Sequence, residues 1–181
     1  MTPPERITTA QLTLRRWAVD DAPALRAALD ASDAHLRPWI PFMRDEPRTL
    51  EQTRVRLEQF VREFDQGPHL RYAVWTRGSE NTELVGEVML LARPLTDDPD
   101  PSTTTEAGYW IHVDHVGHGY ATEATRPLIE LGFALGKRRV VLLCDPENIA
   151  SNAVAAKLGA VAALDLVEAS LRLWEVTPAQ A

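Results

Sequence analysis

The chain has 181 residues, 45% of them hydrophobic and 25% charged, an ordinary globular composition that can bury a core without disulfides or metals. Its formal net charge of −7 repels phosphate groups and argues against a general nucleic-acid binder. The single cysteine, Cys144, allows neither an internal disulfide nor a cysteine metal cluster, which suits a reducing cytoplasm.

Neither a leader peptide nor a membrane span is expected. Residues 1–10 are polar and lack the apolar centre of a signal peptide. No apolar run approaches the ~20 residues that cross a bilayer. We therefore expect one cytoplasmic domain over residues 1–181, with no membrane partner and no nucleic-acid partner.

The first half of the chain predicts a strand, two helices and an irregular segment between them. Leu12 and Leu14 alternate with polar residues and predict a strand that ends near Arg15. Asp20 and Asp21 are candidate N-caps of a short helix. The apolar segment 35–43 contains two prolines, which prevent a regular helix. Thr49 and Gln52 form a capping box for a helix that ends at Gly67-Pro68 and buries Leu50, Leu57, Val61 and Phe64.

Two further strands and a loop are predicted next. Residues 72–76 and 84–91 read as strands, the second with a bulge at Gly86. The proline-rich segment Ala92 to Thr105 predicts an exposed loop, and Glu106 to Val113 the next strand.

The last third alternates helices and strands. Residues 119–136 are helical by their apolar spacing, 140–144 form a buried strand, and 148–158 form a helix that ends at Gly159. At least one more strand is expected within 161–176. This order predicts a partly parallel sheet at the C-terminal end and hairpins earlier, in a mixed α/β sandwich.

A glycine-rich turn carries the strongest chemical signal. Gly117 and Gly119 lie between a predicted strand and a predicted helix, where unpaired amides can bind a pyrophosphate. The lysine and Ser/Thr of a Walker loop and the third glycine of a dinucleotide fingerprint are absent. On this local pattern alone, a plain tight strand-to-helix turn is the favoured interpretation.

Three stretches together resemble the GNAT acetyltransferase superfamily. They are Glu106-Ala-Gly-Tyr-Trp-Ile111, Gly117-His-Gly-Tyr-Ala-Thr-Glu-Ala124 and Asp145-Pro-Glu-Asn-Ile-Ala-Ser-Asn152, followed by Lys157-Leu-Gly159. The similarity is greatest to ribosomal-protein N-terminal (Ser/Ala) acetyltransferases and spans about four-fifths of the chain. It implies a largely antiparallel central sheet flanked by helices, in which two neighbouring parallel strands splay apart to form the cofactor cleft.

The resemblance also implies acetyl-CoA as co-substrate, with no metal. Main-chain groups of Ile111 and Val113 would pair with pantetheine, and Asn148 would face the cofactor. The pyrophosphate loop would comprise Val116, Gly117, His118, Gly119, Tyr120, Ala121 and Thr122. Asp114 departs from the Gln or Arg that often begins this loop. The region after Gly159 is shorter than is usual in the family, so one wall of the acceptor pocket would be missing or supplied by another subunit.

The catalytic candidates are Ser151 and Glu106. The resemblance implies that Ser151 is the general acid toward the CoA sulfur; alternatively it satisfies a helix N-terminus. Glu106 is the candidate base, because partial burial raises a carboxylate pKa; alternatively it is a solvated or paired strand-end charge. Glu87 and Glu168 are competing bases.

Several aromatic and histidine residues have two interpretations. The resemblance implies that Trp39, Phe42 and Met43 bind the acceptor, whereas core packing is the plainer interpretation. His118 can reach a phosphate or be solvated. Tyr109 and Trp110 alternate on a strand, so one should enter the core and the other should meet a helix.

The expected function is direct acetyl transfer from acetyl-CoA to a primary amine, on a protein N-terminus or a small molecule. A non-catalytic acyl-CoA-binding regulatory module is the alternative, and an interaction protein whose glycine loop is only a turn is a third. Dimers are frequent in the family, so a homodimer is considered, although no patch in the sequence requires one.

Overall fold

The computed structural model describes residues 2–78, 82–92, 101–166 and 171–178, and within them eight strands form one sheet in the order β1-β2-β3-β4-β5-β6-β8-β7. The strands are β1 (Arg6–Thr8), β2 (Leu12–Arg16), β3 (Leu70–Thr76), β4 (Leu84–Leu91), β5 (Thr104–Ile111), β6 (Arg139–Cys144), β7 (Val161–Leu166) and β8 (Leu171–Val176). The α-helices are α1 (Ala22–Ala31), α2 (Asp33–Leu36), α3 (Leu50–Gln66), α4 (Tyr120–Ala134) and α5 (Ile149–Lys157). None of the helices in these ranges is long and apolar enough to cross a membrane.

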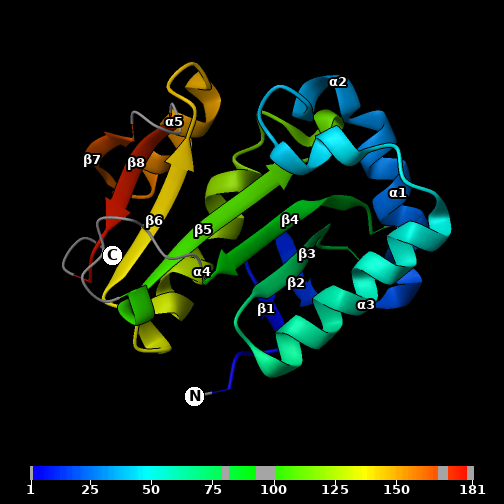
Figure 1. The fold of residues 1–181 in the computed structure, drawn as a ribbon, viewed down its shortest axis with the longest axis horizontal. Coiled ribbons are helices and arrows are strands. Elements are labelled where there is room, and N and C mark those ends of the chain that lie inside the picture. Colours follow the sequence, from blue (N-terminus) through cyan, green and yellow to red (C-terminus); the bar gives the residue numbers. More distant parts are fainter. Residues whose placement is uncertain (1, 79–81, 93–100, 167–170, 179–181) are drawn as a thin grey trace.

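The sheet is antiparallel at every junction except that between β5 and β6. Their parallel register runs only from Thr104↔Arg139 to Glu106↔Val141. Beyond this point the two strands diverge, as the separating arrowheads of β5 and β6 show (Figure 1). The predicted mixed fold is therefore confirmed, including its splayed parallel pair.

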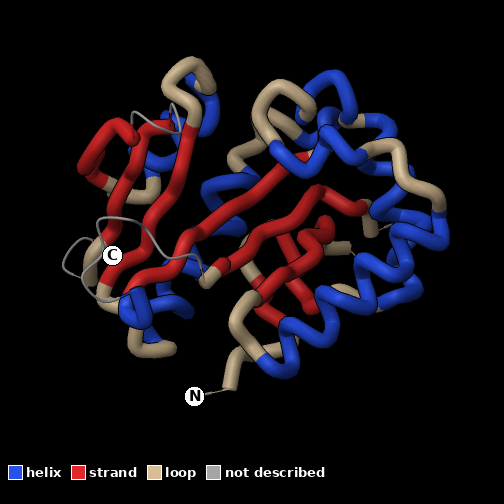
Figure 2. Tube along the Cα trace, in the orientation of Figure 1, coloured by secondary structure: helices blue, strands red, loops and turns tan. Residues whose placement is uncertain are grey.

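Helices cover both faces of the sheet and enclose two cores (Figures 1 and 2). Helices α4 and α5 pack on one face, and α1 and α3 pack on the other. Side chains alternate between the faces along each strand. On β5, Trp110 joins the core under α1 and α3, whereas Tyr109 points to α5, as the alternation predicted.

Helix α3 begins at the predicted capping box. The Thr49 hydroxyl accepts from the Gln52 amide, and the Gln52 side chain accepts from the Thr49 amide. The buried stripe differs from the prediction, because Leu50, the first helical residue, is 38% exposed and Val61 is half-buried. The stripe consists instead of Thr53, Leu57, Phe60 and Phe64.

Some element boundaries were predicted wrongly. Strand β1 had no alternation long enough to reveal it. Of the predicted loop Ala92 to Thr105, residues 93–100 lie outside the described chain, Pro101–Thr103 is a 3-10 turn, and Thr104 and Thr105 belong to β5 because they pair with β6. The C-terminal region holds two strands, β7 and β8, and β8 pairs with β6.

Gly86 lies at the predicted bulge. The β3–β4 register shifts between Val74 and Trp75, opposite this glycine. A Cβ atom on Gly86 would lie 2.1 Å from the Trp110 carbonyl oxygen, far inside contact distance. The sheet can therefore close against β5 here only with glycine.

Candidate active site

A cavity of about 330 Å³ passes through the sheet where β5 and β6 diverge. Its walls come from both faces, because the missing pairing leaves space between the strands. On the α1/α3 face the lining includes Arg71, Met89, Leu91, Glu106 and Trp110. On the α4/α5 face it includes Ala107, Tyr109, Leu142, Cys144, Asn148 and Ser151. Leu171 of β8 also contributes, so the short C-terminal region does supply part of the wall.

A larger and shallower hollow of about 480 Å³ lies over β1 and β2. Arg15 is held there by both carboxylate oxygens of Asp21, and Arg16 pairs with Glu5 and Asp65. These groups satisfy one another, and the hollow is remote from the splayed strands. The cavity between β5 and β6 is therefore the candidate site.

The main chain of β5 presents its groups to the gap. The His112 amide donates to the Val85 carbonyl, at 2.7 Å, so His112 faces β4. Since neighbouring residues of a strand turn their amides to opposite sides, the Ile111 amide faces the diverging β6. The Val113 amide differs, because it donates to the Oγ of buried Ser32 at 3.1 Å. Ile111 is thus the better placed of the two for pairing with a ligand.

The glycine turn leads into α4. Gly117 and Gly119 both have φ of +80°, a conformation that favours glycine, and Gly119 is the N-cap residue. A Cβ at either position would meet nothing within 4 Å, so the glycines are needed for the backbone and not for space. Residues 116–119 are exposed, and the first amides of α4 have no partner within the helix. The His118 ring stacks on Tyr120, at 5.4 Å between centroids.

Three uncharged side chains meet inside the cavity. The Ser151 Oγ lies 2.9 Å from the Tyr109 hydroxyl and 3.3 Å from the Cys144 Sγ. We call these residues the hydroxyl–thiol cluster. Burial raises the pKa of Tyr109 to about 12 and also raises the pKa of the Cys144 thiol, so both stay protonated at neutral pH.

Asn148 fixes the position of this cluster. Its Oδ1 accepts from the Ser151 amide at 3.0 Å and caps α5. The cap uses the backbone of Ser151, so the serine hydroxyl remains directed at Tyr109 and Cys144. Sequence reasoning had singled out Ser151 and Asn148 but not Tyr109 or Cys144; the position of Tyr109 on the α5 face of a strand was the available signal.

The two described carboxylates differ in their surroundings. Glu106 lines the cavity and is 9% exposed. Glu87 is 2% exposed and accepts from the indoles of Trp17 and Trp110, both at 3.1 Å, with Arg71 at 3.5 Å. Glu87 is therefore committed to internal donors. Glu168 lies outside the described residues.

The segment before α3 reaches the cavity in part. Trp39 and Phe42 line it, and Trp39 is 37% exposed. Met43 is fully buried in the core under α1 and α3 and does not line the cavity, which agrees with the core-packing interpretation. The Arg56 guanidinium lies over the Phe42 ring, 4.2 Å from its centroid.

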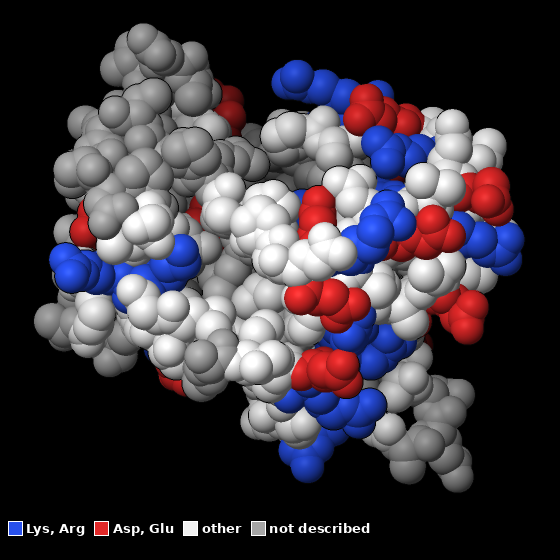
Figure 3. Space-filling model, turned by 60° about the horizontal axis from the view of Figure 1, so that its bottom comes forward, with Lys and Arg blue, Asp and Glu red and all other residues white. Residues whose placement is uncertain are grey.

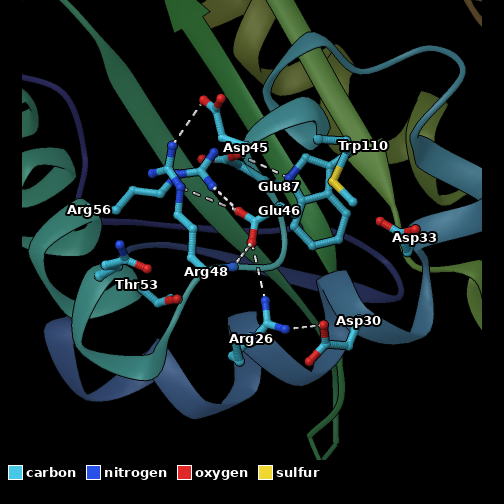
Figure 4. A network of polar contacts seen from close by, with 12 residues as sticks. Arg26, Asp30, Asp33, Asp45, Glu46, Arg48, Thr53, Arg56, Glu87 and Trp110 are labelled. Atoms are coloured by element: carbon cyan, nitrogen blue, oxygen red, sulfur yellow. Dashed lines mark hydrogen bonds and ion pairs between the residues drawn. The ribbon is translucent and has the colours of Figure 1, made fainter.

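A buried ion cluster lies beside this segment and was not predicted (Figure 4). The Glu46 side chain is 3% exposed and accepts from Arg26 and Arg56, each at 3.1 Å, and from the Arg48 amide at 2.8 Å. Burial lowers the pKa of Arg56, and the charges of Glu87 and Glu46 oppose that effect.

Elsewhere on the surface, charges of both signs are interspersed on the face in Figure 3. Within the described ranges, no three His, Cys, Asp or Glu side chains are grouped to hold a metal ion.

The structure combines a mixed α/β sheet that has one splayed parallel pair with a cavity at the splay and a glycine turn before a helix. The family model described as "Acetyltransferase (GNAT) domain" matches residues 11–161. The chain therefore belongs to the GNAT acetyltransferase family, which confirms the resemblance.

Individual relatives agree with this assignment. The uncharacterized N-acetyltransferase YnaD of Bacillus subtilis (strain 168) is 37% identical over 57 residues, a match that spans 31% of this chain and only 34% of that protein. The structure of RimL, a ribosomal L7/L12 alpha-N-protein acetyltransferase in complex with coenzyme A, has a TM-score of 0.83 at 21% identity and covers 96% of this chain and 98% of that one. The microcin C7 self-immunity acetyltransferase MccE, in complex with acetyl-CoA and AMP, has a TM-score of 0.76 at 18% identity, with coverage of 97% and 98%. At these identities the solved structures show a shared fold.

Proposed function

We infer that this chain transfers an acetyl group from acetyl-CoA directly to a primary amine, on a protein N-terminus or on a small molecule. The cavity through the sheet carries this inference. It lets a donor from the α4/α5 face and an acceptor from the α1/α3 face meet between β5 and β6. Direct transfer between two bound reactants needs no covalent enzyme intermediate.

The donor side fits an acyl-CoA. The exposed glycine turn, residues 116–122, offers helix-start amides to a pyrophosphate, and the gap beside Ile111 can take an extended pantetheine arm. Asn148 caps α5 at the edge of the cavity. RimL, solved with coenzyme A, and MccE, solved with acetyl-CoA and AMP, share the fold of this chain. Acetyl-CoA supplies an activated thioester, and the rest of the chemistry falls to the protein.

Each step of the transfer has a candidate group. The Ile111 amide faces the gap and can donate to the developing oxyanion. Glu106 lines the acceptor side and takes the proton of the attacking amine. Ser151 donates to the departing sulfur. Trp39 and Phe42 border the route by which the acceptor enters.

Thermal unfolding with and without ligand tests the donor site. At ~100 times its dissociation constant, acetyl-CoA or CoA should add ~2.7 kcal/mol of stability and raise Tm by a few degrees. ATP is the matched control, because it has phosphates without pantetheine. No shift with millimolar acetyl-CoA would overturn the proposal.

Turnover separates an enzyme from a binding module. Release of free CoA, followed with a thiol reagent, should accelerate when an acceptor is added from a panel of N-terminal peptides and small amines. Binding without release for any acceptor would favour the acyl-CoA-binding regulatory module instead.

A further inference from the structure

We propose that Tyr109 is a positioning residue that directs the Ser151 hydroxyl proton toward the leaving sulfur. This inference rests on the proposed function, in which Ser151 serves the thiol leaving group. Tyr109 lies on β5 and has no role in the proposed transfer steps. The contacts within the hydroxyl–thiol cluster support a role for it.

The relative acidity of the two hydroxyls favours one direction of donation. The Tyr109 hydroxyl and the Ser151 Oγ lie 2.9 Å apart, and either can donate. A phenol is a better donor than an alkyl alcohol, because its pKa is much lower. When Tyr109 donates, the serine oxygen is the acceptor and its own proton must point elsewhere.

The other side of Ser151 faces a sulfur atom. Cys144 Sγ lies 3.3 Å from the serine oxygen, and both residues line the cavity. The serine proton, displaced from Tyr109, is then available to Cys144 Sγ or, when the donor is bound, to a thioester sulfur in the same cavity. In this arrangement a bound thioester sulfur at the same end of the cavity would receive the same hydrogen bond.

The hydrogen bonds reinforce one another during the reaction. As the C–S bond of the tetrahedral intermediate breaks, the sulfur keeps the electron pair and Ser151 donates to it. Donation from Tyr109 polarises the serine hydroxyl and strengthens that bond. Glu106 takes the proton lost by the amine and then passes it to solvent, and the departing thiolate takes one proton from solvent to become free CoA thiol, so no proton is gained or lost overall.

The test is a double-mutant cycle on kcat with Tyr109→Phe and Ser151→Ala. Each single variant should lower kcat by about 10–100-fold with the KM for acetyl-CoA changed by less than about 3-fold, because a hydrogen bond to a charge that develops in the transition state is lost. The double variant should be no slower than Ser151→Ala alone, because Tyr109 acts only through Ser151. The proposal would be overturned if the kcat losses of the two single variants multiplied in the double variant. It would also be overturned if the kcat of Tyr109→Phe stayed within about 3-fold of wild type.

Tyr72→Phe is the matched control. Tyr72 is fully buried on β3, and its hydroxyl donates to the Pro4 carbonyl at 2.7 Å, away from the cavity. It loses one buried phenol hydrogen bond, as Tyr109→Phe does, and should keep wild-type kcat. Wild-type protein that neither binds acetyl-CoA nor releases CoA would instead refute the proposed function, so the two failures are distinct.

Replacing Tyr109 with 3,5-difluorotyrosine keeps the test decisive if Tyr109→Phe does not fold. Fluorination lowers the pKa of the phenol while preserving its shape. The alkaline limb of the kcat–pH profile should then move to lower pH, because Tyr109 loses its donated proton earlier. A limb that does not move would mean that Tyr109 only fills space, which contradicts the proposal.

Discussion

Two polar regions of the molecule, one around Glu46 and one around Ser151, are built in opposite ways. Around Glu46, buried charges are matched by charges, with three donors within 3.1 Å of one carboxylate. Around Ser151, the hydroxyl–thiol cluster holds only neutral groups. A charge that loses its partner in the interior is costly, whereas a neutral hydroxyl exchanges partners at small cost. The ionic region therefore suits a fixed framework, and the neutral region suits a site that must respond to a ligand.

The largest expected effect comes from breaking the ionic region with Glu46→Ala. Arg56 would be left buried without its Glu46 partner and Arg26 would keep only Asp30, so the free energy of unfolding should fall by about 3–5 kcal/mol. The midpoint of urea denaturation measures it. The control, Glu58→Ala, removes an exposed pair with Arg62 at 3.8 Å and should cost under about 1 kcal/mol. Equal losses in both variants would contradict the contrast drawn between the regions.

Ser151→Ala should reverse that pattern. Loss of its hydrogen bond to the sulfur should raise the activation barrier by about 1.4–2.7 kcal/mol, seen as a 10–100-fold lower rate of CoA release. The free energy of unfolding should change by less than about 1 kcal/mol, because the neutral partners can pair with each other or with water. Ser102→Ala, in the 3-10 turn that precedes β5, is the control and should leave the rate unchanged. A large loss of stability in Ser151→Ala would mean that the cluster is a structural unit.

Gly119→Ala tests the glycine turn before α4, which is proposed to bind the pyrophosphate through main-chain amides. Alanine at φ of +80° should cost about 1–2 kcal/mol of stability, although its Cβ meets nothing. The Tm shift with acetyl-CoA should shrink as well, because the strained turn no longer presents its amides. Gly78→Ala has equal space and no positive φ, and should be neutral. If Gly119→Ala and Gly78→Ala have the same stability and the same Tm shift with acetyl-CoA, the positive φ of Gly119 does not contribute to binding.

The smallest effect concerns Glu123, an ion held by neutral donors. Burial pushes its pKa up, but hydrogen bonds from Thr9 and Gln11 outweigh burial and bring the pKa below the ordinary 4.5. A lowered pKa stabilises the fold above pH 4.5, and this contribution is lost as the pH falls through the lowered value. The difference in unfolding free energy between wild type and Glu123→Gln should therefore be constant near neutral pH and narrow in acid. Glu130→Gln, an exposed substitution on the same helix, is the matched control for removing one carboxylate.

The sequence was most informative where a local rule decides the structure. The capping box at Thr49, the apolar strand β4 and the helix after Gly119 each depend on residues within one element, and all three are present. Five predicted site residues line one cavity: Trp39, Phe42, Glu106, Asn148 and Ser151. Their roles in catalysis and binding remain predictions.

The remainder depends on contacts that no local pattern encodes. The Val113 amide is held by Ser32, 81 positions away, and Tyr109 meets Ser151 across 42 positions. Glu46 is followed by Pro47 in an irregular segment, where neither helical nor strand periodicity indicates that its carboxylate is buried among arginines. A sequence pattern can place a side chain on one face of a helix or strand. Which distant residue that side chain contacts depends on how the chain packs.

Gly86 has a consequence for how freely this enzyme can vary. A library randomised at position 86 and selected for folded protein should return glycine almost alone, because the Trp110 carbonyl occupies the space of any side chain. The same library at Gly78, which has open space, should return many residues. Position 86 on β4 is therefore expected to tolerate no other residue, whereas other positions can vary. Designs that alter the acceptor side of the cavity should retain Gly86.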